Sequence, residues 1–133
     1  MPVRWNCPVM VRSRTDYRAA ERWGRRAEMF CRLALRLKGY RIVASRLRVP
    51  AGEIDILAER RGLLAVVEVK ARASEEAALA TMSEARWRRL HRAASQVLAS
   101  RPRFARHAIR FDLMLVTSRR WPRHLTDIWR PEN

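Results

Sequence analysis

Hydrophobic residues along the chain follow the two periods that distinguish helices from strands. Residues 16–38 carry apolar side chains every three or four positions, which predicts a helix, and Gly39 is placed to end it. The expected buried stripe of this helix is Ala20, Trp23, Ala27, Phe30, Ala34 and Leu37. The same period predicts a second helix over residues 83–100, with Ser83 as its N-cap.

Four further segments are rich in aliphatic residues and bounded by turn residues, as strands are. They are residues 40–49, 52–59, 63–71 and 109–117. Gly62 supplies the turn between the second and third of them, and residues 125–129 are expected to form a short edge strand. The order helix, three strands, helix, one or two strands predicts an α/β fold with a mixed central sheet flanked by helices.

The length of 133 residues suits one domain. Residues 1–15 contain prolines and arginines without a clear period and are expected to form a flexible basic tail before a single domain at 16–133. The chain shows no secretory signal and no run of about 18 apolar residues that would span a membrane. A cytoplasmic protein without a membrane partner is therefore expected.

The chain is strongly basic, with 29 Lys and Arg residues against 13 Asp and Glu and a formal net charge of +16. A folded domain with this imbalance usually binds a polyanion, most often nucleic acid. The alternatives are a ribosome-associated protein or an Arg-rich protein from a biased genome. Only Lys38 and Lys70 are lysines, so Lys70 differs chemically from the arginines that supply nearly all the positive charge.

The segment GEIDILAERRGLLAVVEVKA, residues 52–71, places charges among aliphatic residues. With a turn centred on residues 61–62, Asp55 lies directly opposite Glu68, and Glu53 lies opposite Lys70. Side chains facing each other in this way have Cβ atoms about 4.5–5.5 Å apart, at which two carboxylates repel. A divalent cation between Asp55 and Glu68 would make the arrangement favourable.

A solvated sheet face with a Glu53–Lys70 cross-strand pair is the alternative interpretation of this hairpin. Two observations favour a site. Ile54 and Ile56 are expected to share an apolar face opposite to the charges, and the charged face itself becomes apolar toward the turn. The charges therefore gather at one end of a largely buried hairpin, where a cleft would lie.

An Asp followed across a hairpin by Glu-x-Lys resembles the PD-(D/E)xK nuclease core, here Asp55 and Glu68-Val69-Lys70. The longer string, with Gly52-Glu53-Ile54-Asp55, Val67-Glu68-Val69-Lys70, Arg72 and Arg110-Phe111-Asp112, resembles the YraN-like family of uncharacterised bacterial proteins. Gly24 and Glu28 match a Gly and a Glu on the first helix of that family. The chain departs from the family at Arg86, where a Lys is usual, and at Arg46, where an Asn is usual.

The resemblance implies a restriction-endonuclease-like core in the order α-β-β-β-α-β and a metal-dependent nuclease acting on DNA, with branched or single-stranded DNA as candidate substrates. Asp55, Glu68 and the Val69 carbonyl would hold Mg²⁺ or Mn²⁺, and Lys70 would stabilise developing charge. The further catalytic candidates are Glu53 and Glu28. The candidate nucleic-acid contacts are Arg72, Arg86 and Arg89.

Other interpretations stay open at this point. The fold could bind nucleic acid without cleaving it, and the net charge supports that function equally well. Glu28 could simply pair with Arg25 or Arg32 one helical turn away. Among the tryptophans, Trp5 and Trp121 could anchor a protein partner or a homodimer, whereas Trp129 is expected to cap the core.

Overall fold

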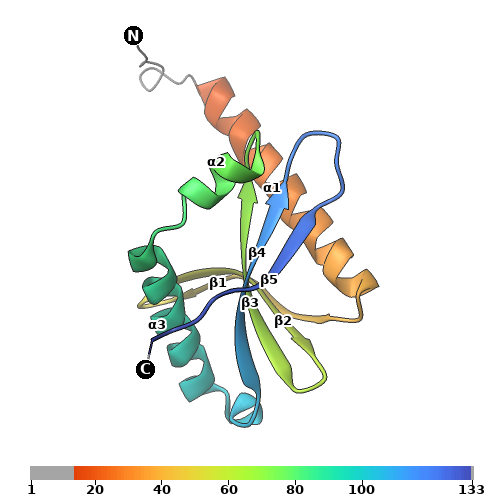
Figure 1. The fold of residues 1–133 in the computed structure, drawn as a ribbon. Coiled ribbons are helices and arrows are strands. Elements are labelled where there is room, and N and C mark those ends of the chain that lie inside the picture. Colours follow the sequence, from red (N-terminus) through yellow and green to blue (C-terminus); the bar gives the residue numbers. More distant parts are fainter. Residues whose placement is uncertain (1–13, 133) are drawn as a thin grey trace.

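A five-stranded mixed sheet forms the centre of the protein in a computed structural model that describes residues 14–132 (Figure 1). The helices are α1 (Arg14–Leu37), α2 (Glu75–Ala80) and α3 (Glu84–Ser100), followed by a short 3₁₀ helix, η2 (Pro102–Phe104). The strands are β1 (Arg41–Val49), β2 (Gly52–Arg60), β3 (Leu63–Ala71), β4 (Ala108–Val116) and β5 (Arg123–Trp129). They lie in the order β1-β2-β3-β4-β5, and this confirms the predicted α/β class with a restriction-endonuclease-like order of elements.

All neighbouring strands are antiparallel except β3 and β4, which are parallel. A parallel pair needs a long crossover connection, and α2 and α3 supply it. α2 was not predicted, because a helix of six residues is too short to show a period, although Ser74 caps it by accepting a hydrogen bond from the Ala77 N–H (3.1 Å). Ser83 caps α3 in the same way, as predicted.

The predicted boundary of the first helix needs one correction. α1 begins at Arg14, so it includes the last two residues of the predicted tail, and the rest of that tail lies outside the described residues. At the other end, Gly39 adopts a φ of 91°, and the Tyr40 N–H bonds back to the Leu35 carbonyl (3.0 Å). This left-handed turn ends the helix where the sequence predicted.

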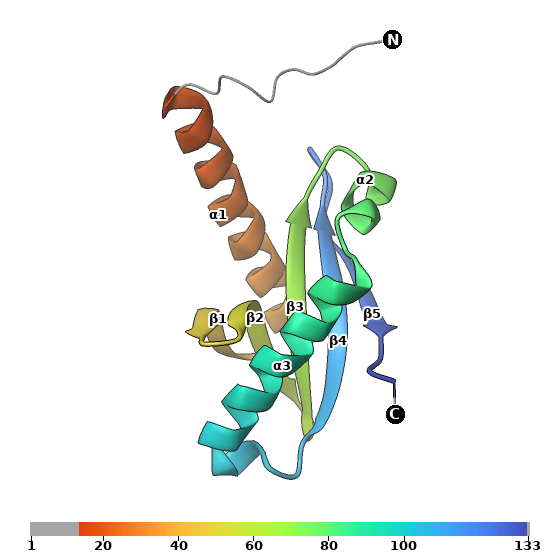
Figure 2. The same cartoon turned by 90° about the vertical axis from the view of Figure 1, so that its left-hand side faces the viewer.

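Helices cover both faces of the sheet, α1 on one side and α3 on the other (Figure 2). The core beneath α3 is the larger and contains Trp87, Leu90, Val97, Phe104 and Phe111. Trp129 stacks on Trp87 with their rings 6.0 Å apart, so it caps this core as expected. No helix among residues 14–132 has the length and apolar character that a membrane span requires.

The buried face of α1 differs from the predicted stripe. Ala27, Cys31, Ala34 and Leu35 are buried against the sheet, whereas the predicted stripe residues Trp23, Phe30 and Leu37 are 38%, 40% and 72% exposed. Ala27 and Ala34 of the predicted stripe are buried as predicted, but the helix is rotated so that its larger members lie at the edge of the contact and Cys31 and Leu35 face the sheet. Close packing of α1 on the sheet follows from this choice of small residues.

A buried polar network joins β4 and β5 to the start of β1. Asp112 is fully buried, and its carboxylate accepts hydrogen bonds from Arg110 (2.6 and 2.7 Å), His124 Nε2 (2.7 Å) and the backbone N–H of Asp127 (2.9 Å). Arg110 also donates to the Tyr40 hydroxyl (2.5 Å). Burial alone would raise the pKa of Asp112, but these hydrogen bonds outweigh it and lower the pKa.

We predict that Asp112→Asn destabilises the protein by about 3–5 kcal/mol at neutral pH, because it removes the fully buried carboxylate that pairs with the partly buried Arg110. The lowered pKa of Asp112 means that its contribution is complete above the unfolded-state value of about 4 and is lost as the pH falls through the folded-state pKa. Urea unfolding of both proteins from neutral to acid pH measures the difference, which should shrink in acid.

Asp127→Asn is the matched control, because Asp127 forms an exposed ion pair with Arg130 and touches Asp112 only through its backbone. It should leave the stability nearly unchanged. Equal destabilisation by both substitutions would contradict a structural role for the Asp112 carboxylate.

Candidate functional site

The hairpin of β2 and β3 has the register that the sequence predicted. Arg61 and Gly62 form its two-residue turn, both with positive φ (50° and 77°), as in the type I′ turns that suit hairpins. The paired residues run from Arg60–Leu63 at the turn to Ile56–Val67. In this register, Asp55 and Glu68 are the residues that come next after Ile56 and Val67 on the two strands.

The ladder stops at Ile56–Val67, and the strands part at the residues of interest. Asp55 Oδ2 accepts a hydrogen bond from the backbone N–H of Val69 (2.9 Å), so a side chain replaces the backbone bond that a continued ladder would make. The two carboxyl groups are close enough for Asp55 and Glu68 to share a hydrogen bond when one of them is protonated. The parting of the strands thus brings both acids to one opening in the sheet.

A twist of β2 accompanies this parting and corrects the simple alternation assumed from the sequence. Ile54 packs in the core beneath α3, whereas Ile56, two residues later, packs beneath α1. A regular strand would place both on the same face. Asp55 lies at the twist and lines cavities on both sides of it.

Arg46 lies opposite this irregular point on β1 and has a φ of 51°, in the left-handed region that Asn tolerates better than Arg. Asn, the residue that the family resemblance implies at this position, would adopt this conformation with less strain. Arg46 pairs instead with Glu28 of α1 (Nε to Oε2, 2.7 Å). The alternative that Glu28 pairs with Arg25 or Arg32 is therefore wrong, and Arg25 pairs with Glu21.

Glu68 is nearly inaccessible, at 2% exposed, and two cations face it. Arg86 of α3 donates to Glu68 Oε2 through Nε (2.9 Å) and a terminal nitrogen (2.6 Å), while Lys70 Nζ lies 3.6 Å from the same oxygen. The two cations offset the charges of the two carboxylates. Arg86 therefore binds the Glu68 carboxylate, whereas the sequence predicted that it would contact a phosphate.

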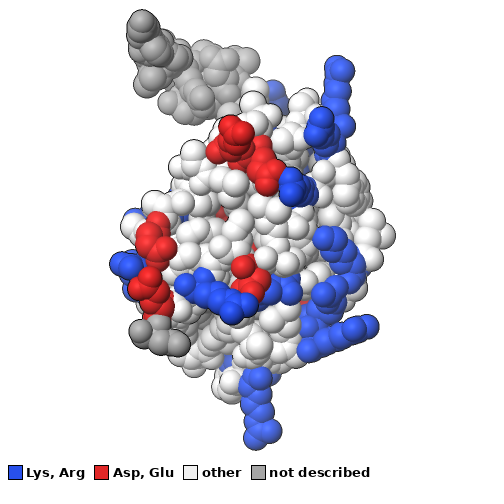
Figure 3. All heavy atoms as spheres, viewed as in Figure 1, with Lys and Arg blue, Asp and Glu red and all other residues white. Residues whose placement is uncertain are grey.

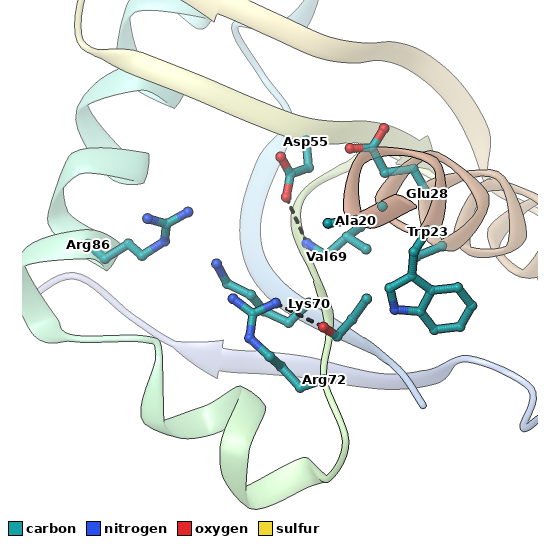
Figure 4. Close-up of a pocket in the computed structure, with 11 residues that line it drawn as sticks. Ala20, Trp23, Glu28, Asp55, Val69, Lys70, Arg72 and Arg86 are labelled. Carbon is teal, nitrogen blue, oxygen red and sulfur yellow. Dashed lines mark hydrogen bonds between the residues drawn. The ribbon is translucent and has the colours of Figure 1, made fainter. Parts of the chain in front are cut away.

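Burial and the neighbouring Glu68 carboxyl raise the pKa of Asp55 to about 8, and the Val69 N–H only partly opposes them. Burial also lowers the pKa of Lys70, which is 8% exposed. Lys70 Nζ donates no hydrogen bond within 3.5 Å to any described residue and points into the opening beside Asp55 (Figure 4). An acid and a lysine with shifted pKa values in one cavity are typical of a functional site.

A cavity of about 610 Å³ opens on the α1 side of the parted strands. Asp55, Val69, Lys70, Arg72 and Arg86 line one side of it, and α1 lines the other (Figure 4). A smaller cavity of about 220 Å³ lies toward α3 and also reaches Asp55 and Arg86. Glu68, Glu53 and Arg89 line this smaller cavity.

The remaining predicted residues fall at the rim. Glu53 is exposed and pairs with Arg48 of β1 (2.8 Å), so the predicted cross-strand partner Lys70 is not its partner. Arg72 is exposed and bonds to the neighbouring Ala71 carbonyl (2.9 Å). Arg89 is exposed at the mouth of the smaller cavity, where its side chain packs over Gly52.

Trp23 was predicted to be a core residue, but it lines the larger cavity. Its indole is 38% exposed and borders the larger cavity together with Ala20 and Gly24 (Figure 4). The helical period alone made it a core residue. A large aromatic one position before a helical glycine was the available signal.

The residues present fit a hard divalent cation with few protein ligands. Among the described residues no group of three or more His, Cys, Asp or Glu side chains converges, so the donor set is the two carboxylates and backbone oxygen. Mg²⁺ is commonly bound by one or two carboxylates while it keeps several waters. The N–H and C=O of a residue point to the same neighbouring strand, so the Val69 carbonyl faces the Asp55 side.

The raised pKa of Asp55 predicts how stability depends on pH without divalent metal. The folded state binds the proton more tightly than the unfolded state, whose Asp titrates near about 4. The charge of Asp55 therefore destabilises the fold progressively as the pH rises from about 4 toward about 8. Asp55→Asn should match the wild type at about pH 4.5 and exceed its melting temperature at about pH 8.

Thermal unfolding in the presence of a chelator measures this difference. Glu28, Arg46, Glu68, Lys70 and Arg86 also face Asp55, so the comparison uses the difference between the two proteins at each pH. A constant difference across this range would show that Asp55 titrates normally.

Comparison with known proteins identifies the family. The model of the uncharacterised protein family UPF0102 matches residues 27–116. A UPF0102 protein of Parvibaculum lavamentivorans is 55% identical over 113 residues, covering 85% of each chain. One of Caulobacter sp. (strain K31) is 49% identical and covers 84% of this chain and 80% of its own, and one of Chelativorans sp. (strain BNC1) is 44% identical and covers 88% and 94%. The chain therefore belongs to the UPF0102 family, the YraN-like family that its hairpin motifs resemble.

Proposed function

We propose that this protein is a metal-dependent nuclease that hydrolyses phosphodiester bonds in DNA. The observation that carries the proposal is the pair of carboxylates, Asp55 and Glu68, at the parting of β2 and β3 with Lys70 beside them in a cavity. Asp55, Glu68 and the Val69 carbonyl would hold Mg²⁺ or Mn²⁺. When bound, such a cation polarises a phosphate oxygen and lowers the pKa of water.

The side chains of the protein would position the ligands and stabilise the charge that develops during hydrolysis. Asp55 is held in place by the Val69 N–H, so its second oxygen is free for a ligand. Lys70 enters the cavity almost completely shielded from solvent, where a positive charge acts strongly on developing negative charge. Glu28 lines the larger cavity and Glu53 the smaller one, and each would act through its ion-pair partner, Arg46 or Arg48.

Positive charge around the cavity supports a polyanionic substrate. On the face in Figure 3, Lys and Arg side chains lie mainly along the right-hand and lower edges, and Asp and Glu form small separate groups. Arg72 and Arg89 are exposed beside the cavities and would position the phosphates of DNA. Contacts of this kind give affinity without sequence specificity.

A second candidate function, nucleic-acid binding without cleavage, is favoured by one specific observation. Arg86 already neutralises Glu68 with two hydrogen bonds. An arginine that stays there would compete with a cation for Glu68. The two candidates differ in whether the carboxylates bind metal and in whether DNA is cut.

Calorimetric titration with Mn²⁺ tests the ion site directly. We expect the wild type to bind Mn²⁺ at about pH 8 and Asp55→Asn to give no measurable heat, because the neutral amide cannot replace the carboxylate. Glu59→Gln is the control, since Glu59 lies on the same strand but pairs with Arg41 and His107 outside the cavities. Binding by Asp55→Asn as tight as by the wild type would refute the assignment.

Cleavage of single-stranded and branched DNA in Mn²⁺ tests the role of Lys70. Lys70→Ala should lower the cleavage rate by about 100- to 1,000-fold, as removal of one charge-stabilising group does in other enzymes. Lys38→Ala, the substitution of the other lysine, should retain the wild-type rate because Lys38 bonds to His124 away from the cavities. Equal rates for Lys70→Ala and the wild type would exclude Lys70 from the chemistry.

A further inference from the structure

The larger cavity has lining residues whose presence metal binding alone does not explain. Lys70 is more than nine-tenths buried and, among the described residues, has no hydrogen-bond partner for its ammonium group. Its nearest counter-ion is Glu68 at 3.6 Å, which already accepts two hydrogen bonds from Arg86, so the N–H donors of the Lys70 ammonium group are left for a ligand. The volume of about 610 Å³ exceeds what a metal ion with its waters needs and lies in the range of cavities that hold organic ligands.

The helix wall of this cavity is made of one face of α1. Ala20, Trp23, Gly24, Ala27 and Glu28 follow the i, i+3, i+4, i+7, i+8 spacing of a single helical face. Trp23 is the only large apolar side chain among them, and its indole lies across the cavity from Arg86 (Figure 4). The wall is therefore a flat aromatic surface with open space beside it.

Gly24 is the second sign of a ligand. A glycine inside a helix destabilises it, and here no neighbouring protein atom requires it, because a Cβ built at Gly24 would meet nothing within 4 Å. The space that a side chain would fill belongs to the cavity. The missing side chain thus leaves room for something outside the protein.

We propose that this space holds an unpaired nucleobase stacked on Trp23, with its phosphate reaching Lys70. This inference rests on the proposed function and adds the substrate class, which is DNA with an unpaired nucleotide at the site. A free base has an exposed face for an aromatic side chain to stack on, whereas a base inside a duplex is already stacked on both faces. A duplex, with two backbones and stacked pairs, is also too bulky to enter this cavity.

Binding of a labelled single-stranded oligonucleotide and of a blunt duplex of the same length tests the inference. Fluorescence anisotropy in about 100 mM salt with a chelator measures affinity without cleavage. We expect Trp23→Ala to weaken single-strand binding by about 5- to 100-fold, the usual effect of losing one stacked base, and to leave duplex binding unchanged. Trp23→Phe should restore most of the affinity, because it keeps an aromatic face.

Trp121→Ala is the matched control, since Trp121 is 55% exposed and does not line this cavity. It should not change single-strand affinity. Gly24→Ala should raise the melting temperature, because alanine favours the helix, yet weaken single-strand binding, because its methyl group enters the cavity. This opposite response cannot come from a folding defect.

Equal loss of affinity in Trp23→Ala and Trp121→Ala, or equal effects of Trp23→Ala on single strand and duplex, would overturn the inference. Its failure is distinguishable from failure of the nuclease function. Trp23-dependent binding without any cut product in Mn²⁺ supports the base site and refutes catalysis. Cleavage of duplex that is indifferent to Trp23 supports catalysis and refutes the base site.

Discussion

The site depends on one local event, the parting of β2 and β3 directly after the Ile56–Val67 pair. At that point a backbone hydrogen bond is replaced by the bond from the Val69 N–H to the Asp55 carboxylate. This substitution anchors Asp55 without closing the gap between the strands, and leaves Glu68 and Lys70 at the same opening. A continuous ladder would have placed the same residues on an ordinary sheet surface.

Arg86 and Lys70 face Asp55 and Glu68 at this opening, but the two acids are not stabilised equally. Glu68 has close cationic partners, whereas burial and Glu68 raise the pKa of Asp55, and Lys70 Nζ has no hydrogen-bond partner among the described residues. These two groups are the ones that a cation and a phosphate would satisfy. The Arg86–Glu68 pair is what a cation would have to displace or share.

The rest of the molecule stabilises this arrangement from both sides. The small buried residues of α1 let the helix pack closely on the sheet, which brings its Trp23 and Gly24 face to the cavity. The Asp112 network ties β4 and β5 to the corner between α1 and β1, so the helix end opposite to the cavity is fixed. Helix α3 is held by the aromatic stack of Trp87 and Trp129, and it carries Arg86.

Much of this could be predicted from sequence, because strand periods, turn residues and register are local properties. The turn at Arg61–Gly62 fixed the pairing that leads to Asp55 and Glu68. Three features could not be predicted. The twist at Asp55 breaks the alternation that the prediction assumed, the Arg86–Glu68 and Arg46–Glu28 pairs join elements far apart in the chain, and the rotation of α1 exposes Trp23.

The central claim is that the parted strands form a cation site, and anomalous diffraction from a crystal soaked in Mn²⁺ tests it most directly. The account predicts a peak between Asp55 and Glu68 beside the Val69 carbonyl, and a map with no peak and Arg86 still bound to Glu68 would contradict it.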